Sequence, residues 1–100
     1  MNPTRLTQYV RIQIPAALRR FTDQQREIEL EAATVGEALQ ALAARYPALS
    51  SHLFTPDGSL RAFVNVYVED TNIRQLEGLD TPVKEGTRLI LVPSIAGGHQ

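Results

Sequence analysis

Two adjacent glycines, Gly97 and Gly98, are the residues of this 100-residue chain with the clearest chemical use. They follow an apolar segment that ends at Pro93. Because glycine has no Cβ, a Gly-Gly backbone can enter a narrow channel that other residues would block. Such a segment suits the delivery of a main-chain group into the active site of another protein. Paired glycines also occur in frayed segments without a function. The residues upstream must therefore decide between a reactive segment and a frayed one.

The remaining chemical groups are few. The chain has no cysteine, which excludes disulfides, thiol catalysis and cysteine metal sites, so that any sulfur chemistry needs another carrier. The two histidines, His52 and His99, are far apart in the sequence. Asp57 and Asp70 lie in predicted turns, where aspartate serves local hydrogen bonding. We therefore expect no metal site and no catalytic group of the chain's own.

Charge and composition exclude further classes. Ten Lys and Arg residues against eleven Asp and Glu residues give a net charge of -1 without a basic run, which argues against nucleic-acid binding. No apolar run approaches the roughly 20 residues of a membrane span. Residues 1–5 show no signal-peptide pattern, so a cytoplasmic protein is expected. We predict one domain over residues 1–93, followed by a tail over residues 94–100.

The elements that position this tail begin with two strands. Residues 9–14 alternate, with Val10, Ile12 and Ile14 on one face, and Pro15 ends the strand. Residues 16–21 allow a short helical turn. A second strand follows over residues 26–31, in which Ile28 and Leu30 face inward and Glu27, Glu29 and Glu31 face water. Two strands this close in sequence are expected to pair in antiparallel fashion.

A helix follows the second strand. Thr34 and Glu37 have the spacing of a capping box. An apolar stripe at helical spacing continues from it, formed by Val35, Ala38, Leu39, Leu42, Ala43 and Tyr46. Pro47 is predicted to stop the helix near residue 45 or 46. The stripe is expected to pack on the sheet.

The second half of the chain is again extended. Residues 48–60 are predicted to be a connection with a turn at residues 55–58. Residues 63–68 form a strand, and a short strand is expected around Ile73 and Arg74.

The last strand completes the fold. Residues 75–83 look irregular, and residues 88–92 form a strand that is apolar on both faces and therefore central. This order predicts an α+β fold, a mixed sheet of four to five strands with one main helix packed across one face, as in the β-grasp of ubiquitin-like proteins. A ferredoxin-like fold would need a second long helix, which residues 75–83 cannot supply.

Three segments resemble one family. Residues 83–98 are similar to the end of the ubiquitin-like sulfur carriers, which include the small subunit of molybdopterin synthase, the thiamine-pathway carrier, and carriers for cysteine, homocysteine or thioacid siderophore synthesis. Residues 63–70 resemble the family's middle strands, and residues 14–19 resemble the end of its first strand. The length and the segment from Pro15 to Arg19 favour the molybdopterin-synthase-like and amino-acid-pathway branches. The closest resemblance is to the amino-acid or thioacid-siderophore pathway carriers that are made with a C-terminal extension.

The resemblance implies a role as a protein cofactor. A partner adenylating enzyme would use ATP to activate the carboxyl of Gly98, and sulfur would then replace AMP to give a main-chain thiocarboxylate. This group would donate sulfur in the biosynthesis of cysteine, homocysteine or methionine, or a thioacid metabolite. Ala96, Gly97 and Gly98 form the reactive tail, and the chain itself binds no cofactor.

One departure from the family pattern concerns the residues after Gly98. His99 and Gln100 hold the Gly98 carboxyl in a peptide bond. Some family members are precursors whose extension is removed by a zinc metalloprotease, and we predict processing between Gly98 and His99. The alternatives are a molybdopterin synthase small subunit, a non-activated ubiquitin-like interaction module, and attachment of Gly98 to a lysine. The sequence does not identify the sulfur acceptor.

The sheet has more apolar side chains than one helix covers. Some of them should remain exposed, and the candidates are Leu60, Phe63, Ile90, Val92 and Ile95. Contiguous exposed apolar area usually marks an interface. We expect this second face to dock the adenylating enzyme and the sulfur-accepting synthase, with self-association as the alternative.

Overall fold

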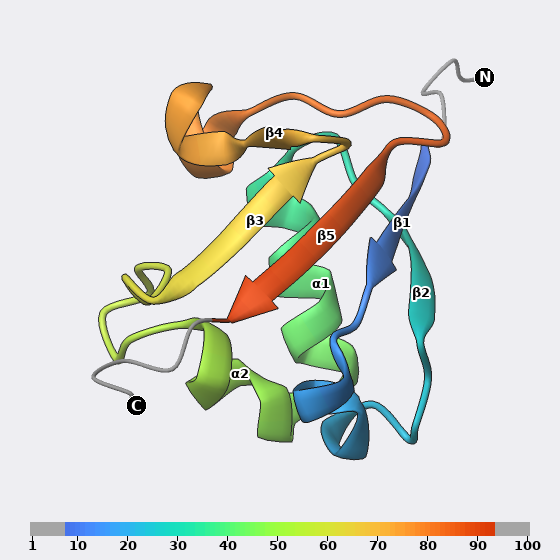
Figure 1. The fold of residues 1–100 in the computed structure, drawn as a ribbon, viewed down its shortest axis with the longest axis vertical. Helices are drawn as coiled ribbons and strands as arrows, with labels where there is room; N and C mark the ends of the chain where they lie inside the picture. Colours follow the sequence, from blue (N-terminus) through green and yellow to red (C-terminus); the bar gives the residue numbers. More distant parts are fainter. Residues whose placement is uncertain (1–7, 94–100) are drawn as a thin grey trace, which may run out of the picture.

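The computed structural model describes residues 8–93, and residues 1–7 and 94–100 lie outside the described part. The elements follow one another in this order (Figure 1): β1 (Tyr9–Gln13), the 3-10 helix η1 (Ala16–Phe21), β2 (Glu27–Glu31), α1 (Val35–Arg45), α2 (Pro47–Leu53), β3 (Val64–Val68), β4 (Thr71–Asn72), the 3-10 helices η2 (Ile73–Gln75) and η3 (Gly78–Asp80), and β5 (Arg88–Pro93).

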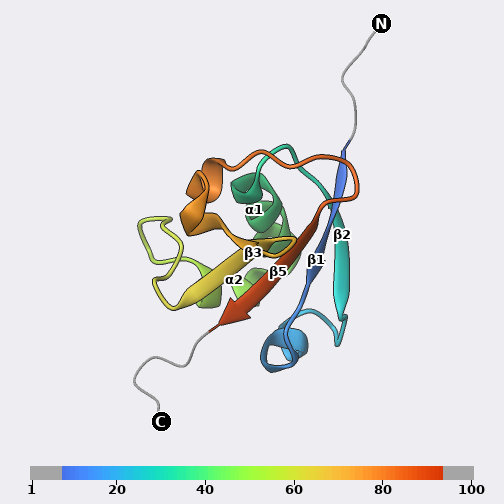
Figure 2. The same ribbon diagram turned by 45° about the horizontal axis from the view of Figure 1, so that its top comes forward.

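The strands form one mixed sheet in the order β2-β1-β5-β3-β4. The first and last strands, β1 and β5, pair in parallel, and the other neighbours pair in antiparallel fashion. Helices α1 and α2 lie behind the sheet, while no α-helix of the described residues lies on its other face (Figures 1 and 2). This arrangement confirms the predicted β-grasp fold and the central place of the last strand.

Alternation along the strands fills the core. The strand residues that point toward α1 are fully buried: Val10 and Ile12 of β1, Val66 of β3 and Leu89 of β5. Four apolar residues of α1 are fully buried as well: Val35, Ala38, Leu39 and Leu42. Burying a leucine or isoleucine side chain contributes roughly 1.5–3 kcal/mol. The predicted helix stripe is confirmed over these four positions, and its last members, Ala43 and Tyr46, are half-buried.

The predicted start of α1 is also confirmed. The Glu37 N–H donates to Thr34 Oγ1 at 3.1 Å. The Glu37 carboxylate accepts from the Ala33 N–H at 2.8 Å, one residue earlier than in the usual capping box. The Val35 N–H donates to the Thr81 carbonyl at 3.0 Å, so the segment before β5 also holds the start of this helix.

Two local predictions were wrong. Residues 48–60 were expected to be a connection, but Pro47–Leu53 form the helix α2. Pro47 ends α1 and also occupies the first turn of α2, where a missing N–H leaves no hydrogen bond unmade. Leu49 and Leu53, four residues apart, are both fully buried, and this pair was the helical signal in the sequence.

The second error concerns the short strand. It lies at Thr71–Asn72, and Ile73 and Arg74 instead begin η2. Asn72 Oδ1 accepts from the Arg74 N–H at 2.9 Å and thereby caps this turn. The side chain of Asn72 favours a helical turn after it. The prediction followed the strand propensity of Ile73 and missed this signal.

Candidate functional site

The uncovered face of the sheet is ordered by strand register. Asn72, Tyr67, Ile90, Gln13 and Glu27 lie side by side in one row across all five strands. The side chains of this row are aromatic on β3 and aliphatic on β5, and they become polar on β1 and acidic on β2. The apolar part of this face therefore lies over β3 and β5.

An apolar patch lies along these two antiparallel strands and extends to the end of β5, which is beside the start of β3. We define it as Tyr67, Ile90 and Val92 on the uncovered face, with Phe63 at the border, one residue before β3. Val92 is 40% exposed and Phe63 is 38% exposed, and the other two are half-buried. Val92 lies opposite Asn65, and Val64, next to Phe63, lies opposite Pro93. The patch thus borders the point where β5 leads into residues 94–100.

The sequence-predicted interface residues divide into three groups. Phe63, Ile90 and Val92 lie in the patch. Leu60 forms an isolated bridge with Phe54 and packs against the core, so it is not part of the patch. Ile95 lies outside the described residues. Tyr67 was missed, although its alternation with Val66 and Val68 placed it on the uncovered face.

The upstream end of the same face is charged. Arg11 lies in register with both Arg88 of β5 and Glu29 of β2. Glu27, Glu29 and Glu31 are all exposed, as predicted for a solvated outer strand. The Glu69 carboxylate accepts from the Arg88 N–H at 2.9 Å. Polarity therefore falls along β5 toward its end.

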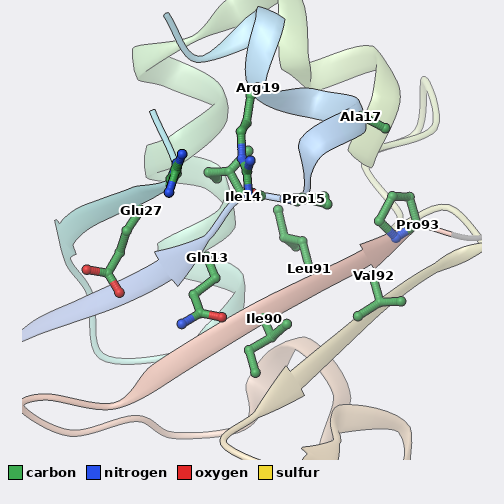
Figure 3. A pocket seen from close by; sticks show the side chains of 11 residues that line it. Gln13, Ile14, Pro15, Ala17, Arg19, Glu27, Ile90, Leu91, Val92 and Pro93 are labelled. Atoms are coloured by element: carbon green, nitrogen blue, oxygen red, sulfur yellow. The ribbon is translucent and has the colours of Figure 1, made fainter. Parts of the chain in front are cut away.

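A groove of about 720 Å³ opens beside the end of β5 (Figure 3). It lies between this strand and the segment that leaves β1. Its lining residues are Gln13, Ile14, Pro15, Ala17, Arg19, Arg26, Glu27, Ile90, Leu91, Val92 and Pro93. The groove therefore adjoins the apolar patch through Ile90 and Val92.

Pro15 explains why the groove exists. The Arg11 N–H donates to the Thr87 carbonyl at 2.9 Å, and the parallel register ends at Gln13 opposite Ile90. The hydrogen bonds of a parallel ladder recur every two residues. Continuing the ladder would therefore bring the N–H of residue 15 to the Leu91 carbonyl, but proline has no N–H. The chain then turns into η1, and β5 continues past the end of its neighbour.

Arg19 fixes one wall of the groove. Its Nε donates to the Ile14 carbonyl at 3.0 Å, which ties η1 to the end of β1. Figure 3 shows the Arg19 side chain reaching from η1 toward Ile14 and Pro15. Within residues 8–93 no hydrogen bond engages the terminal nitrogens of this guanidinium, which carries five N–H donors in all.

Comparison with known proteins identifies the family. The model of the ThiS family matches residues 12–98. The chain belongs to the ThiS family.

Individual ThiS-type relatives agree with this assignment. The chain is 35% identical over 91 residues to the sulfur carrier protein CysO of Mycobacterium tuberculosis H37Rv, covering 89% of this chain and 98% of that one. The small archaeal modifier protein 1 of Methanosarcina acetivorans superposes with a TM-score of 0.84 at 28% identity, covering 93% and 99% of the two chains.

A third comparison includes a complex. A chain of the Amycolatopsis orientalis BexX/CysO complex superposes with a TM-score of 0.80 at 35% identity, covering 89% of this chain and 99% of that one. Taken with the family match, these relatives show that the chain is a sulfur carrier protein of the CysO and ThiS type, a family whose members are not catalytic.

The predicted reactive residues of this ThiS-family chain lie beyond the described part. Ala96, Gly97, Gly98 and His99 are outside residues 8–93. Within the described range, no group of three or more His, Asp or Glu side chains could hold a metal ion. Likewise, no helix of the described residues is long and apolar enough to cross a membrane.

The remaining chemical candidates have structural roles. His52 is exposed, lies in α2 instead of the predicted loop, and stacks on Phe21 with ring centroids 4.3 Å apart. Asp57 accepts from the Thr55 hydroxyl and, at 3.0 Å, from the Ser59 N–H. These bonds lower the pKa of Asp57 below its ordinary value of 3.8, with the Thr55 bond as the largest cause. Among the described residues, Asp70 accepts from the neighbouring Thr71 hydroxyl alone, at 3.4 Å.

Proposed function

We propose that this sulfur carrier holds sulfur on the main-chain carboxyl of Gly98, after His99 and Gln100 have been removed. The observation that carries the proposal is the polarity of β5. This strand runs from a charged end toward the apolar patch and then continues into the tail. The family match ends at residue 98, which supports Gly98 as the last residue of the active form.

The chemistry requires an activated carboxyl. The Gly98 carboxylate attacks the α-phosphorus of ATP in a partner adenylating enzyme, and pyrophosphate leaves. A hydrosulfide equivalent then attacks the carbonyl carbon of the acyl adenylate, and AMP leaves with the bonding electrons. The product is a thiocarboxylate, so a chain without cysteine carries sulfur on its backbone.

Docking is assigned to the apolar patch. The patch reaches the end of β5, where the tail begins, on a face that no α-helix of residues 8–93 covers. A partner that binds there receives the tail at the same time. The proposed partners are the adenylating enzyme, the zinc metalloprotease that frees Gly98, and the sulfur-accepting synthase. The relative solved in the BexX/CysO complex supports binding of a second protein by carriers of this type.

Removal of the extension can be tested directly. Purified chain ending at Gly98 should support ATP–pyrophosphate exchange by the adenylating enzyme of the same organism, while the chain ending at Gln100 should support none. A chain ending at Gly97 is the matched control, because it has a free carboxyl on a tail that is one residue short. Equal exchange with the chains ending at Gly98 and Gln100 would refute processing as a requirement.

The state of the protein in its host is the complementary test. Intact-protein mass spectrometry on chain isolated from its own host should show loss of His99 and Gln100, with a fraction that carries sulfur in place of one oxygen. Persistence of the unmodified chain would instead indicate a non-activated interaction module. We propose the synthesis of cysteine, homocysteine or a thioacid metabolite as the destination of the sulfur, and transfer of ³⁵S from the thiocarboxylate identifies which one.

A further inference from the structure

We propose that the groove beside the end of β5 binds an extended, acidic segment of the adenylating enzyme that receives the tail. This inference rests on the proposed function and adds a second contact next to the apolar patch. It concerns the groove walls formed by Pro15, Ala17, Arg19 and Arg26, which the patch does not include.

The backbone of β5 supplies one reason for an extended ligand. Leu91 lines the groove, and Pro15 cannot donate to its carbonyl. A segment that continues the line of β1 past Gln13 would place an N–H where the proline has none. Addition of an extended segment to an open strand edge is a common mode of peptide recognition, in which main-chain hydrogen bonds provide affinity. Pro15 and Pro93 limit the added pairing to a short stretch.

The charges of the lining supply the reason for an acidic ligand. The lining includes two arginines, Arg19 and Arg26, and one carboxylate, Glu27, so the groove has one more positive than negative side chain. The hydrogen bonds within residues 8–93 engage only Nε of Arg19, and none involves the guanidinium of Arg26. A guanidinium fork matches a carboxylate in geometry and charge. An Asp or Glu side chain of the added segment would complete this arrangement.

The position of Pro93 points to a partner that receives the tail. Pro93 lines the groove and is also the residue from which the tail continues. An enzyme that takes Gly98 into its active site must cover the surface around the start of the tail. The groove lies within this surface, and among the three proposed partners we assign it to the adenylating enzyme, which activates Gly98.

A charge series at Ala17 tests the groove without removing an interaction of the fold. Ala17 is exposed and lines the groove. We expect Ala17→Glu to raise the Kd for the adenylating enzyme about fivefold, and Ala17→Lys to lower it about twofold, as is usual for charges at the rim of an interface. Ala44→Glu, at an exposed position of α1, is the matched control and should leave the Kd unchanged.

Three outcomes separate this inference from the proposed function. Equal Kd values for wild type, Ala17→Glu and Ala17→Lys, with normal adenylation of Gly98, would overturn the groove alone. Tighter binding by Ala17→Glu than by Ala17→Lys would overturn the acidic character of the segment. Failure of wild-type chain ending at Gly98 to be adenylated would overturn both proposals.

Photo-crosslinking identifies the occupant directly. A benzoylphenylalanine at position 17 should crosslink to a peptide of the adenylating enzyme that contains Asp or Glu in an extended segment. The same probe at position 44 is the control and should give no crosslink. Crosslinks from position 17 to a helix, or none while a probe at position 63 in the apolar patch reacts, would overturn the inference.

Discussion

Tyr67 and Ile90 lie opposite each other in the antiparallel pair of β3 and β5, on the face of the sheet that no α-helix of residues 8–93 covers. Cross-strand neighbours of this kind have Cβ atoms only about 5 Å apart, so an aromatic and a β-branched side chain pack together. Ile90 is also in register with Gln13 of β1. The pair therefore forms the inner border of the apolar patch, between the exposed Val92 and the polar half of the sheet.

Replacing Ile90 by glutamate should weaken docking and leave the fold intact. The side chain points to the uncovered face, so a charge there disturbs a partner's surface more than the core. We expect the Kd for the adenylating enzyme to rise by about tenfold or more, and the free energy of unfolding to fall by only about 1 kcal/mol. An unchanged Kd in a calorimetric titration would exclude Ile90 from the interface.

Leu89, the preceding residue of the same strand, is the matched control. It is fully buried under α1, so Leu89→Ala leaves a cavity. The free energy of unfolding should fall by about 2–5 kcal/mol. The Kd should stay unchanged at temperatures where the variant is folded, measured beside the Ile90 variant.

Arg74 should stabilise the outer edge of β3. Its Nη2 donates to the carbonyls of Ala62 at 2.9 Å and Val64 at 3.2 Å, where β4 no longer covers the strand. Arg74→Ala should lower the free energy of unfolding in urea by about 1 kcal/mol, since water replaces part of these bonds. Hydrogen exchange of the Val66 amide should accelerate.

The control for Arg74 is another exposed arginine. Arg45→Ala, at the end of α1, should change the stability by no more than about 0.5 kcal/mol. Equal losses in the two variants would show that charge, and not the carbonyl contacts, explains the effect of Arg74.

Thr34→Ala should remove the cap of α1. The Glu37 N–H would lose its acceptor, with a loss of about 1 kcal/mol in the free energy of unfolding. Thr34→Ser keeps the hydroxyl and should retain most of the stability. If serine and alanine destabilise equally, the methyl group and not the cap is responsible.

The contribution of Asp57 and its loop to the stability of the folded chain should depend on pH. Hydrogen bonds from Thr55 and Ser59 lower the pKa of Asp57 below 3.8 in the folded chain. A carboxyl whose pKa is lower in the folded state stabilises that state above its unfolded pKa, and the contribution disappears as the pH falls through the lowered pKa. Thr55→Val should therefore raise the pKa of Asp57, measured by carbon-detected NMR titration of the carboxyl. An unchanged pKa would assign the shift to Ser59.

Local patterns in the sequence were sufficient for most of the fold. Alternation predicted the strands at residues 9–14 and 26–31, and the Thr34–Glu37 spacing predicted the start of the helix. These predictions succeeded because each pattern depends only on residues within one helical turn or one strand. Pro47 misled the prediction for the opposite reason, since the same residue suits the end of one helix and the start of the next.

The candidate site depended on contacts that the sequence does not show. The apolar run of residues 88–92 predicted a central strand, but only the sheet, with helices on one side, separates the buried Leu89 and Leu91 from the accessible Ile90 and Val92. The groove arises where a parallel ladder between two distant segments stops at Pro15. The sequence alone determined most of the elements and, through the resemblance, the family and the chemistry expected at Gly98. The tertiary structure decided which side chains a partner can reach, because exposure depends on which segments pack together across the whole chain.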